Sequence, residues 1–353
     1  MSKQRPGDGA HRYPPFQTLT LDKTEALAEC DQSDAQSSQR LGRFMAKLNP
    51  LQFGQRSQRG KALVALAAVC FFWGTTWIAS KEGVRHMPAL QLAGIRQFLG
   101  GSCYLFFFLM IKKAALPRGK AWGPIVVLSL LNFMLSNALS TWGVQYISAG
   151  LGSIIGAIFP LWLVVIGFFG SKSKLSSKTA LGLALGFAGI CVVFWDHLAE
   201  FLDPRFRFGI ALSLLSTWTW AFGTLYTKKQ ATAFNPYLSL GLQMVISGAT
   251  LFTGMQVAGA AVPLSAIPAA SWWAIAYLVV FGSVISFIAY LYALQHLPTH
   301  QVSIYAYINP IVAVLLGWAL FDEKFSLAIV LGTAISLYGI YLINVTRQSG
   351  SCK

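Results

Sequence analysis

Ten hydrophobic runs follow one another between residues 62 and 345, separated by short polar segments. A helix needs roughly 20 apolar residues to cross the hydrocarbon core of a bilayer. Only 11% of the residues are charged and 55% are hydrophobic, whereas a soluble domain usually carries about 25% charged residues. The sequence therefore predicts an all-α integral membrane protein with ten transmembrane helices. The expected spans are residues 62–80, 90–111, 123–143, 148–170, 178–195, 208–227, 237–258, 271–294, 299–321 and 326–345.

The hydrophobic part of the chain contains an internal sequence repeat. Residues 73–81 match residues 220–228 at a distance of 147 positions, and residues 153–160 match residues 303–310 at a distance of 150. Each copy holds five spans, and an odd number of crossings turns the second copy upside down in the membrane. Two inverted five-helix repeats let a membrane protein open alternately to its two sides, so this plan indicates transport.

The repeats divide the chain into four parts. We expect a polar tail over residues 1–60, a first repeat over 61–195, a second over 208–346 and a short tail over 347–353. The first tail lacks a sustained hydrophobic pattern, which is typical of a disordered segment. Two alternatives stay open: the tail is a regulatory arm, or translation starts at Met45.

The net charge of +15 raises the question of nucleic-acid binding, but the placement of the basic residues favours a membrane topology. With both termini in the cytoplasm, the cytoplasmic loops and tails beyond residue 46 hold fifteen Lys and Arg residues, against five on the opposite side. This is the distribution that the positive-inside rule describes. We therefore expect a multi-pass protein of the plasma membrane (the bacterial inner membrane), with a lipid bilayer and a small-molecule substrate as partners and no nucleic acid.

The residues that would support metal, redox or proton chemistry are sparse in the predicted spans. Five cysteines form no Cys-x-x-Cys pair, so no zinc site, disulfide framework or other cofactor is expected. No Asp or Glu lies in the middle of a span, which argues against a simple carboxylate proton relay and against an enzyme.

Short motifs follow one another in matching order in the two copies: residues 72–74, 94–98 and 149–160 in the first, and 218–221, 242–244, 309–310 and 321–324 in the second. Together they resemble the EamA-type permeases of the drug/metabolite transporter superfamily, over about residues 61–346. The resemblance implies ten spans, a central cavity and movement of solutes across the plasma membrane, often outward. One residue departs from the family pattern: the acidic residue that usually ends the fourth span is Glu323 in the second repeat but Ser173 in the first.

Matched prolines, Pro160 and Pro310, lie near the middle of the fourth and ninth spans. A proline removes one helical hydrogen bond and clashes with the preceding turn. The pair is a candidate hinge for the transport cycle; the alternative is a static kink that shapes the bundle.

Polar and aromatic residues within the spans are the candidates for a solute-binding cavity, because such pockets combine apolar walls with a few hydrogen-bonding groups. Arg96 either anchors its helix by reaching toward the interface or lies beside the solute path, and Gln243 is its repeat counterpart. The candidates are Trp73, Thr76, Arg96, Asn132, Asn137, Trp220, Gln243, Tyr290, Ser303, Tyr307 and Asn309.

The function expected from these observations is export of a small metabolite, such as an amino acid or a similar organic solute, by alternating access. A membrane-embedded enzyme or a non-transporting scaffold is the alternative. Small-residue motifs at residues 152–156 and 182–186 allow close helix contacts, either within the bundle or in a homodimer.

Overall fold

The computed structural model describes residues 53–170, 177–230, 235–297, 302 and 304–351, and these residues form helices and connecting loops without strands. Within them, eight helical stretches are long and apolar enough to cross a membrane, and two shorter apolar helices follow at Tyr305–Phe321 and Leu327–Ile343. The eight are Gln58–Gly83, Ala89–Ile111, Gly119–Gly143, Ala149–Ile166, Ser177–Trp195, Pro204–Thr227, Pro236–Val257 and Ala269–Ala293. The chain is an all-helical, multi-pass membrane protein.

Several of these stretches are composed of more than one helical segment, because π-helical turns interrupt the α-helix. The α-helices are α2 (Phe53–Gly83), α3 (Ala89–Leu105), α4 (Trp122–Leu128), α5 (Leu139–Gly143), α6 (Ala149–Ala157), α7 (Phe159–Gly170), α8 (Ser177–Trp195), α9 (Pro204–Gln230), α10 (Pro236–Val257), α11 (Ala269–Tyr277), α12 (Ser286–His296), α14 (Tyr305–Phe321) and α15 (Leu327–Ser351). The π-helical segments are η2 (Phe106–Ile111), η4 (Ser129–Ala138) and η7 (Leu278–Ile285), and the 3₁₀ turns are η3 (Gly119–Ala121), η5 (Glu200–Leu202) and η6 (Leu264–Ala266).

The first helix begins earlier than the sequence predicts. α2 starts at Phe53, within the tail that we expected to end at residue 60. Once a helix is nucleated, each added residue gains one backbone hydrogen bond, so α2 continues outward from the apolar span into polar residues. Residues 1–52 of the expected tail lie outside the described part of the chain.

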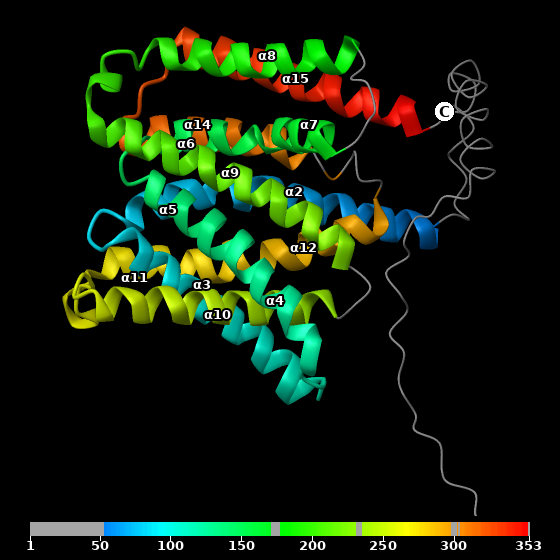
Figure 1. Cartoon of the computed structure of the whole chain (residues 1–353), viewed down its shortest axis with the longest axis vertical. Coiled ribbons are helices and arrows are strands. Elements are labelled where there is room, and N and C mark those ends of the chain that lie inside the picture. The colour runs from blue at the N-terminus through cyan, green and yellow to red at the C-terminus, as the bar shows by residue number, and fades with distance from the viewer. Residues whose placement is uncertain (1–52, 171–176, 231–234, 298–301, 303, 352–353) are drawn as a thin grey trace, which may run out of the picture.

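The helices run side by side, and helices from the two halves of the chain pack as pairs (Figure 1). α8 and α15 form one end of the bundle, α3 and α10 pack together toward the other, and α2, α6, α9 and α14 lie between them. Glycines permit the closest approach of α8 to α15. A Cβ atom on Gly182 would lie 2.7 Å from the carbonyl oxygen of Gly339, and one on Gly189 would lie 2.5 Å from that of Gly332. A larger side chain at either position would push the two backbones apart.

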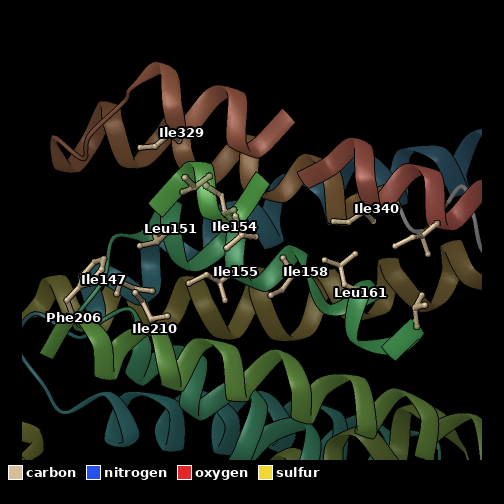
Figure 2. Close-up of a cluster of buried hydrophobic side chains, with 14 residues drawn as sticks. Ile147, Leu151, Ile154, Ile155, Ile158, Leu161, Phe206, Ile210, Ile329 and Ile340 are labelled. Atoms are coloured by element: carbon tan, nitrogen blue, oxygen red, sulfur yellow. The ribbon is translucent and has the colours of Figure 1, made fainter. Parts of the chain in front are cut away.

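A cluster of fourteen buried apolar side chains fills the space around α6 and α7 (Figure 2). Leu151, Ile154 and Ile155 come from α6, whereas Leu161 comes from α7. Partners from α9 and α15 include Ile210 and Ile340. The cluster fixes the position of the fourth span, which forms one wall of the cavity described below.

The two matched prolines have different local structures. The helix is interrupted just before Pro160, where α6 ends at Ala157 and α7 begins at Phe159. Pro310, in contrast, lies inside an uninterrupted α14. In the amide orientation that satisfies its neighbours, Asn309 donates hydrogen bonds to the carbonyl oxygens of Tyr305 and Cys70. These bonds tie the turn before Pro310 to α2, and the repeat counterpart of Asn309 is Phe159, which cannot form them.

Candidate solute cavity

A cavity of about 190 Å³ lies between helices from both halves of the chain. Its lining combines aromatic rings, hydroxyl and amide groups, and one guanidinium group. The lining residues are Trp73, Thr76, Trp77, Ser80, Arg96, Asn132, Phe133, Ser136, Asn137, Ser140, Thr141, Val144, Ser153, Gly156, Ala157, Phe159, Ser216, Thr217, Trp220, Phe287, Tyr305, Ala306, Asn309 and Pro310.

The structure brings many of the sequence-predicted residues together at this cavity. Those that line it are Trp73, Thr76, Arg96, Asn132, Asn137, Trp220, Asn309 and Pro310. Gln243, Tyr290, Tyr307 and Pro160 do not line it, and Ser303 lies outside the described residues.

The four candidates outside the lining have packing positions. Gln243 is buried, and its side-chain amide donates to Ser239 one turn earlier on the same helix. Tyr290 lies behind the cavity wall, with its ring centroid 5.1 Å from that of Trp73. Tyr307 packs against the cluster of Figure 2, and Pro160 follows the lining residue Phe159. Helical repeat position alone therefore does not determine which polar side chains reach the cavity.

Arg96 is the only charged residue among those described along the cavity wall. It lies on α3 and is only 7% exposed. Its Nε donates a hydrogen bond of 3.2 Å to the Ser283 hydroxyl on η7. Its buried position on the cavity wall is the one that a role beside the solute path requires.

An aromatic cluster forms one wall of the cavity around Trp73. The centroid of its ring system lies 5.3 Å from Phe287 and 5.0 Å from Tyr305, and Tyr290 and Tyr305 lie 5.6 Å apart behind it. The indole nitrogen of Trp73 donates to the carbonyl oxygen of Gly282 at 3.3 Å. Offset and edge-on ring contacts of this kind hold aromatic walls in fixed orientations.

The π-helical segments supply both polar groups and backbone acceptors to this region. Segment η4 carries Asn132, Phe133, Ser136 and Asn137 of the cavity lining. On η7, the carbonyl oxygens of Ser283 and Val284 both accept from the Tyr104 hydroxyl at 3.0 Å. A π-helical turn disrupts the regular hydrogen-bond ladder, and such turns are frequent at functional sites.

Several small hydroxyl residues line the cavity beside the residues expected from the sequence. One signal was readable: Asn132, Ser136 and Ser140 recur every fourth position in the third span, which places polar groups on one helix face. The other small hydroxyl residues of the lining that the sequence did not single out are Ser80, Thr141, Ser153, Ser216 and Thr217.

The small-residue motif at residues 152–156 makes room for a cavity-wall side chain. A Cβ atom on Gly156 would lie 2.8 Å from the Trp77 indole, and a Cβ atom on Gly152 would lie 2.9 Å from it. Any residue larger than glycine at either position would therefore collide with this side chain. The motif is therefore occupied within the bundle by the Trp77 indole.

A lysine at the end of α2 is hydrogen-bonded to the turn between α5 and α6. The Lys81 ammonium donates to the carbonyl oxygens of Val144 at 2.8 Å and Ile147 at 2.6 Å. Cations are stabilised beside the free carbonyls of a helix C-terminus, and these carbonyls directly follow α5. We call this arrangement the Lys81 latch. Because Val144 and Ser80 also line the cavity, the latch bounds one end of it.

Glu323 caps the start of α6 from the other half of the chain. Its carboxylate accepts hydrogen bonds from the backbone nitrogens of Ala149 at 2.6 Å and Gly150 at 2.9 Å. Negative charge is favourable at a helix N-terminus, where backbone N–H groups have no helical partner. The acidic residue that the family pattern anticipated thus joins the two halves, whereas Ser173 lies outside the described residues.

Nearby loops are joined by a smaller ionic cluster around Glu200. Lys324 donates to its carboxylate at 2.6 Å, and the His197 ring nitrogen Nδ1 lies 2.9 Å from it. Partial burial raises the pKa of Glu200, but the hydrogen bonds and charges of Lys324 and His197 outweigh this effect and leave the pKa below its ordinary value. The carboxylate is therefore ionised at neutral pH and holds these loops together at the end of the bundle that contains the Lys81 latch.

Comparison with known proteins places the chain among membrane transporters. It is 29% identical over 286 residues to the uncharacterized inner membrane transporter YedA of Escherichia coli strain K12, across 80% of this chain and 90% of that protein. It is 22% identical over 298 residues to the uncharacterized transporter YoaV of Bacillus subtilis strain 168, across 81% and 97% of the two chains.

A solved crystal structure shares the fold, with a TM-score of 0.59 over 82% of this chain and 98% of that one, at 15% sequence identity. The model of the EamA-like transporter family matches the chain twice, over residues 60–195 and 207–345. The resemblance drawn from the short motifs is thereby confirmed. This chain belongs to the EamA-like transporter family and is a multi-pass membrane transporter.

Proposed function

We propose that the chain exports a small organic solute, of about the size of an amino acid, across the plasma membrane by alternating access. The observation that carries this proposal is the cavity of aromatic walls and scattered polar groups, because its walls come from helices of both halves of the chain. A site between two structural repeats can be exposed first to one side and then to the other. Walls from both repeats favour a transporter over the alternatives of a membrane enzyme and an inert scaffold.

The crossing of α3 with α10 supports the inverted repeat. At a distance of 147 positions, Gly94 corresponds to Gly241 and Gly101 corresponds to Gly248. A Cβ atom on Gly94 would lie 3.3 Å from the Gly248 carbonyl oxygen, and one on Gly101 would lie 2.7 Å from that of Gly241. Gly94 thus contacts the counterpart of Gly101, and Gly101 contacts the counterpart of Gly94. This exchange is expected when a two-fold axis relates the two helices.

The α8–α15 pair has the same exchanged pattern. Gly182 and Gly189 correspond to Gly332 and Gly339 at a distance of 150 positions, yet Gly182 meets Gly339 and Gly189 meets Gly332. An axis perpendicular to antiparallel membrane helices lies in the membrane plane. This supports ten spans arranged as two inverted repeats, with residues 61–195 and 208–346 as the units.

The Lys81 latch is a candidate gate for one side of the cavity. Its repeat counterpart is Lys228, which the inverted plan places toward the opposite membrane surface. We propose that release of Lys81 from the α5–α6 turn accompanies opening of the end of the cavity that it bounds. With the basic loops and both termini in the cytoplasm, Lys81 faces outward.

The volume of the cavity is compatible with a small solute. An engineered apolar cavity of about 150 Å³ in another protein accommodates benzene. The volume of about 190 Å³ found here suits a solute of roughly six to ten non-hydrogen atoms on that scale. This range includes common amino acids and short organic acids.

Flux through proteoliposomes that contain only this protein tests the proposal. We expect time-dependent movement of at least one small amino acid or organic acid above the rate of empty vesicles. Ser216→Trp should block the cavity and abolish this flux, whereas Leu215→Trp, at the exposed neighbouring position on α9, should preserve it. Absence of flux for a broad panel of such solutes, or equal flux in the two variants, would contradict the proposed function.

A further inference from the structure

We infer that the solute is an organic anion whose carboxylate docks on the Arg96 guanidinium. This inference rests on the proposed transport function and narrows its substrate class. It follows from the state of Arg96 in the cavity, from the absence of an acidic partner among the described residues, and from the apolar character of the facing walls.

The Arg96 side chain has a buried positive charge without a negative partner in the described part of the chain. Its one hydrogen bond there joins Nε to the neutral Ser283 hydroxyl, and its two Nη groups bond to no described residue. Side-chain ion pairs of the described Asp and Glu residues are formed by Glu82 and Glu200 alone. Glu323 is engaged with the α6 amides. Arg96 is therefore poised for an external anion.

The geometry of the guanidinium selects the kind of anion. Arginine presents a planar fork of N–H donors that matches the two oxygens of a carboxylate. Because Ser283 holds Nε, the Nη groups remain for a ligand. Arg96 lines the cavity, so a carboxylate that enters can reach them. A buried cation is costly in a membrane unless it is paired, and the bound solute would supply that pair.

The rest of the cavity favours a monoanion over a zwitterion. Trp73, Trp220 and Phe287 provide apolar aromatic surface for a hydrocarbon group. The described lining residues include no Asp or Glu to pair with the ammonium group of an amino acid. A desolvated ammonium without a counter-charge is unfavourable, so an α-amino group should weaken binding.

An anionic substrate would also supply the driving force for export. A membrane potential that is negative inside pushes an anion outward, so no coupled proton is needed. This agrees with the absence of Asp and Glu from the middle of the spans.

Binding to the purified full-length protein in nanodiscs tests the inference without requiring transport. Thermal stabilisation would be measured with 4-methylpentanoate, 4-methylpentanamide and L-leucine, which share one branched chain, and with benzoate and benzamide. We expect at least one carboxylate to bind at least tenfold more tightly than its amide, and 4-methylpentanoate to bind more tightly than L-leucine. Arg96→Gln should reduce the carboxylate preference to within twofold, and Arg96→Lys should retain part of it.

A second measurement separates ligand binding from a purely structural role of Arg96. Removing an uncompensated buried charge should leave ligand-free Arg96→Gln at least as heat-stable as the wild type, whereas loss of a structural anchor would lower its stability. Arg207→Gln removes an exposed charge and should leave carboxylate binding unchanged.

The inference is overturned if no carboxylate binds, if amides bind as well as carboxylates, or if Arg96→Gln keeps the preference. Flux of a neutral or zwitterionic solute without carboxylate preference would refute this inference alone. Carboxylate binding without flux of any solute would instead refute the proposed function.

Discussion

At the scale of single residues, Glu323 joins the two halves of the chain by capping α6. Replacing it with Ala removes two charge-assisted hydrogen bonds to the nitrogens of Ala149 and Gly150. We expect the free energy of unfolding to fall by about 1–2 kcal/mol, as for the loss of other helix caps, with a smaller loss for Glu323→Gln. Thermal unfolding in detergent measures this. The adjacent exposed Asp322 provides the control: Asp322→Asn tolerates the same left-handed backbone and should change stability little.

Lys81 offers a residue-level test of gating. Lys81→Gln removes the charge that holds the Val144 and Ile147 carbonyls, so the end of the cavity beside Val144 should open more often. A cysteine introduced at Ser140, which lines the cavity, should then react faster with a membrane-impermeant reagent added outside. A coupling of about 1–3 kcal/mol corresponds to roughly 5–150-fold in the open population. Arg205→Gln, at an exposed position, should leave the rate unchanged; equal effects of the two variants would refute the role of Lys81 as a gate.

At the scale of helices, glycines determine how closely α8 and α15 pack. Ala normally stabilises a helix relative to Gly by about 1 kcal/mol, and Gly254→Ala should show this gain because nothing lies within 4 Å of a Cβ atom there. Gly189→Ala should instead destabilise the protein by about 1–3 kcal/mol, since its Cβ would meet the α15 backbone. Thermal unfolding should show a higher melting temperature for Gly254→Ala and a lower one for Gly189→Ala than for the wild type. Stabilisation by both substitutions would contradict the close contact between α8 and α15.

The prolines allow a second test at this scale, because the helix is broken before Pro160 but continuous through Pro310. If the break between α6 and α7 is a hinge, Pro160→Ala should slow transport by about tenfold, equivalent to ~1.4 kcal/mol in the barrier, by favouring a continuous helix. Pro310→Ala should have the smaller effect. Rates of solute flux in proteoliposomes, normalised to folded protein, would decide this; unchanged flux in the double variant would refute the hinge.

At the scale of the whole molecule, the proposed anionic cargo predicts electrogenic transport. One charge that crosses a potential of 100 mV changes the free energy by about 2.3 kcal/mol, which corresponds to a concentration ratio of roughly 50. A potassium diffusion potential, negative inside, should therefore accelerate efflux of 4-methylpentanoate from proteoliposomes, and 4-methylpentanamide serves as the uncharged control. Carboxylate efflux that ignores the potential would contradict uncoupled export of an anion.

From the amino-acid sequence alone one predicts the all-helical membrane class, the doubling of the chain and a set of candidate polar residues that includes Arg96. Tertiary structure decided which candidates meet: Arg96 finds Ser283, 187 positions away, whereas its repeat counterpart Gln243 bonds within its own helix. The tertiary structure also shows that the helix breaks before Pro160 but continues through Pro310, and that Glu323 caps α6. The physical reason is that lipid and protein interior are both apolar, so hydropathy identifies a spanning helix but not which of its faces points inward. That choice depends on close packing and hydrogen bonds between distant helices.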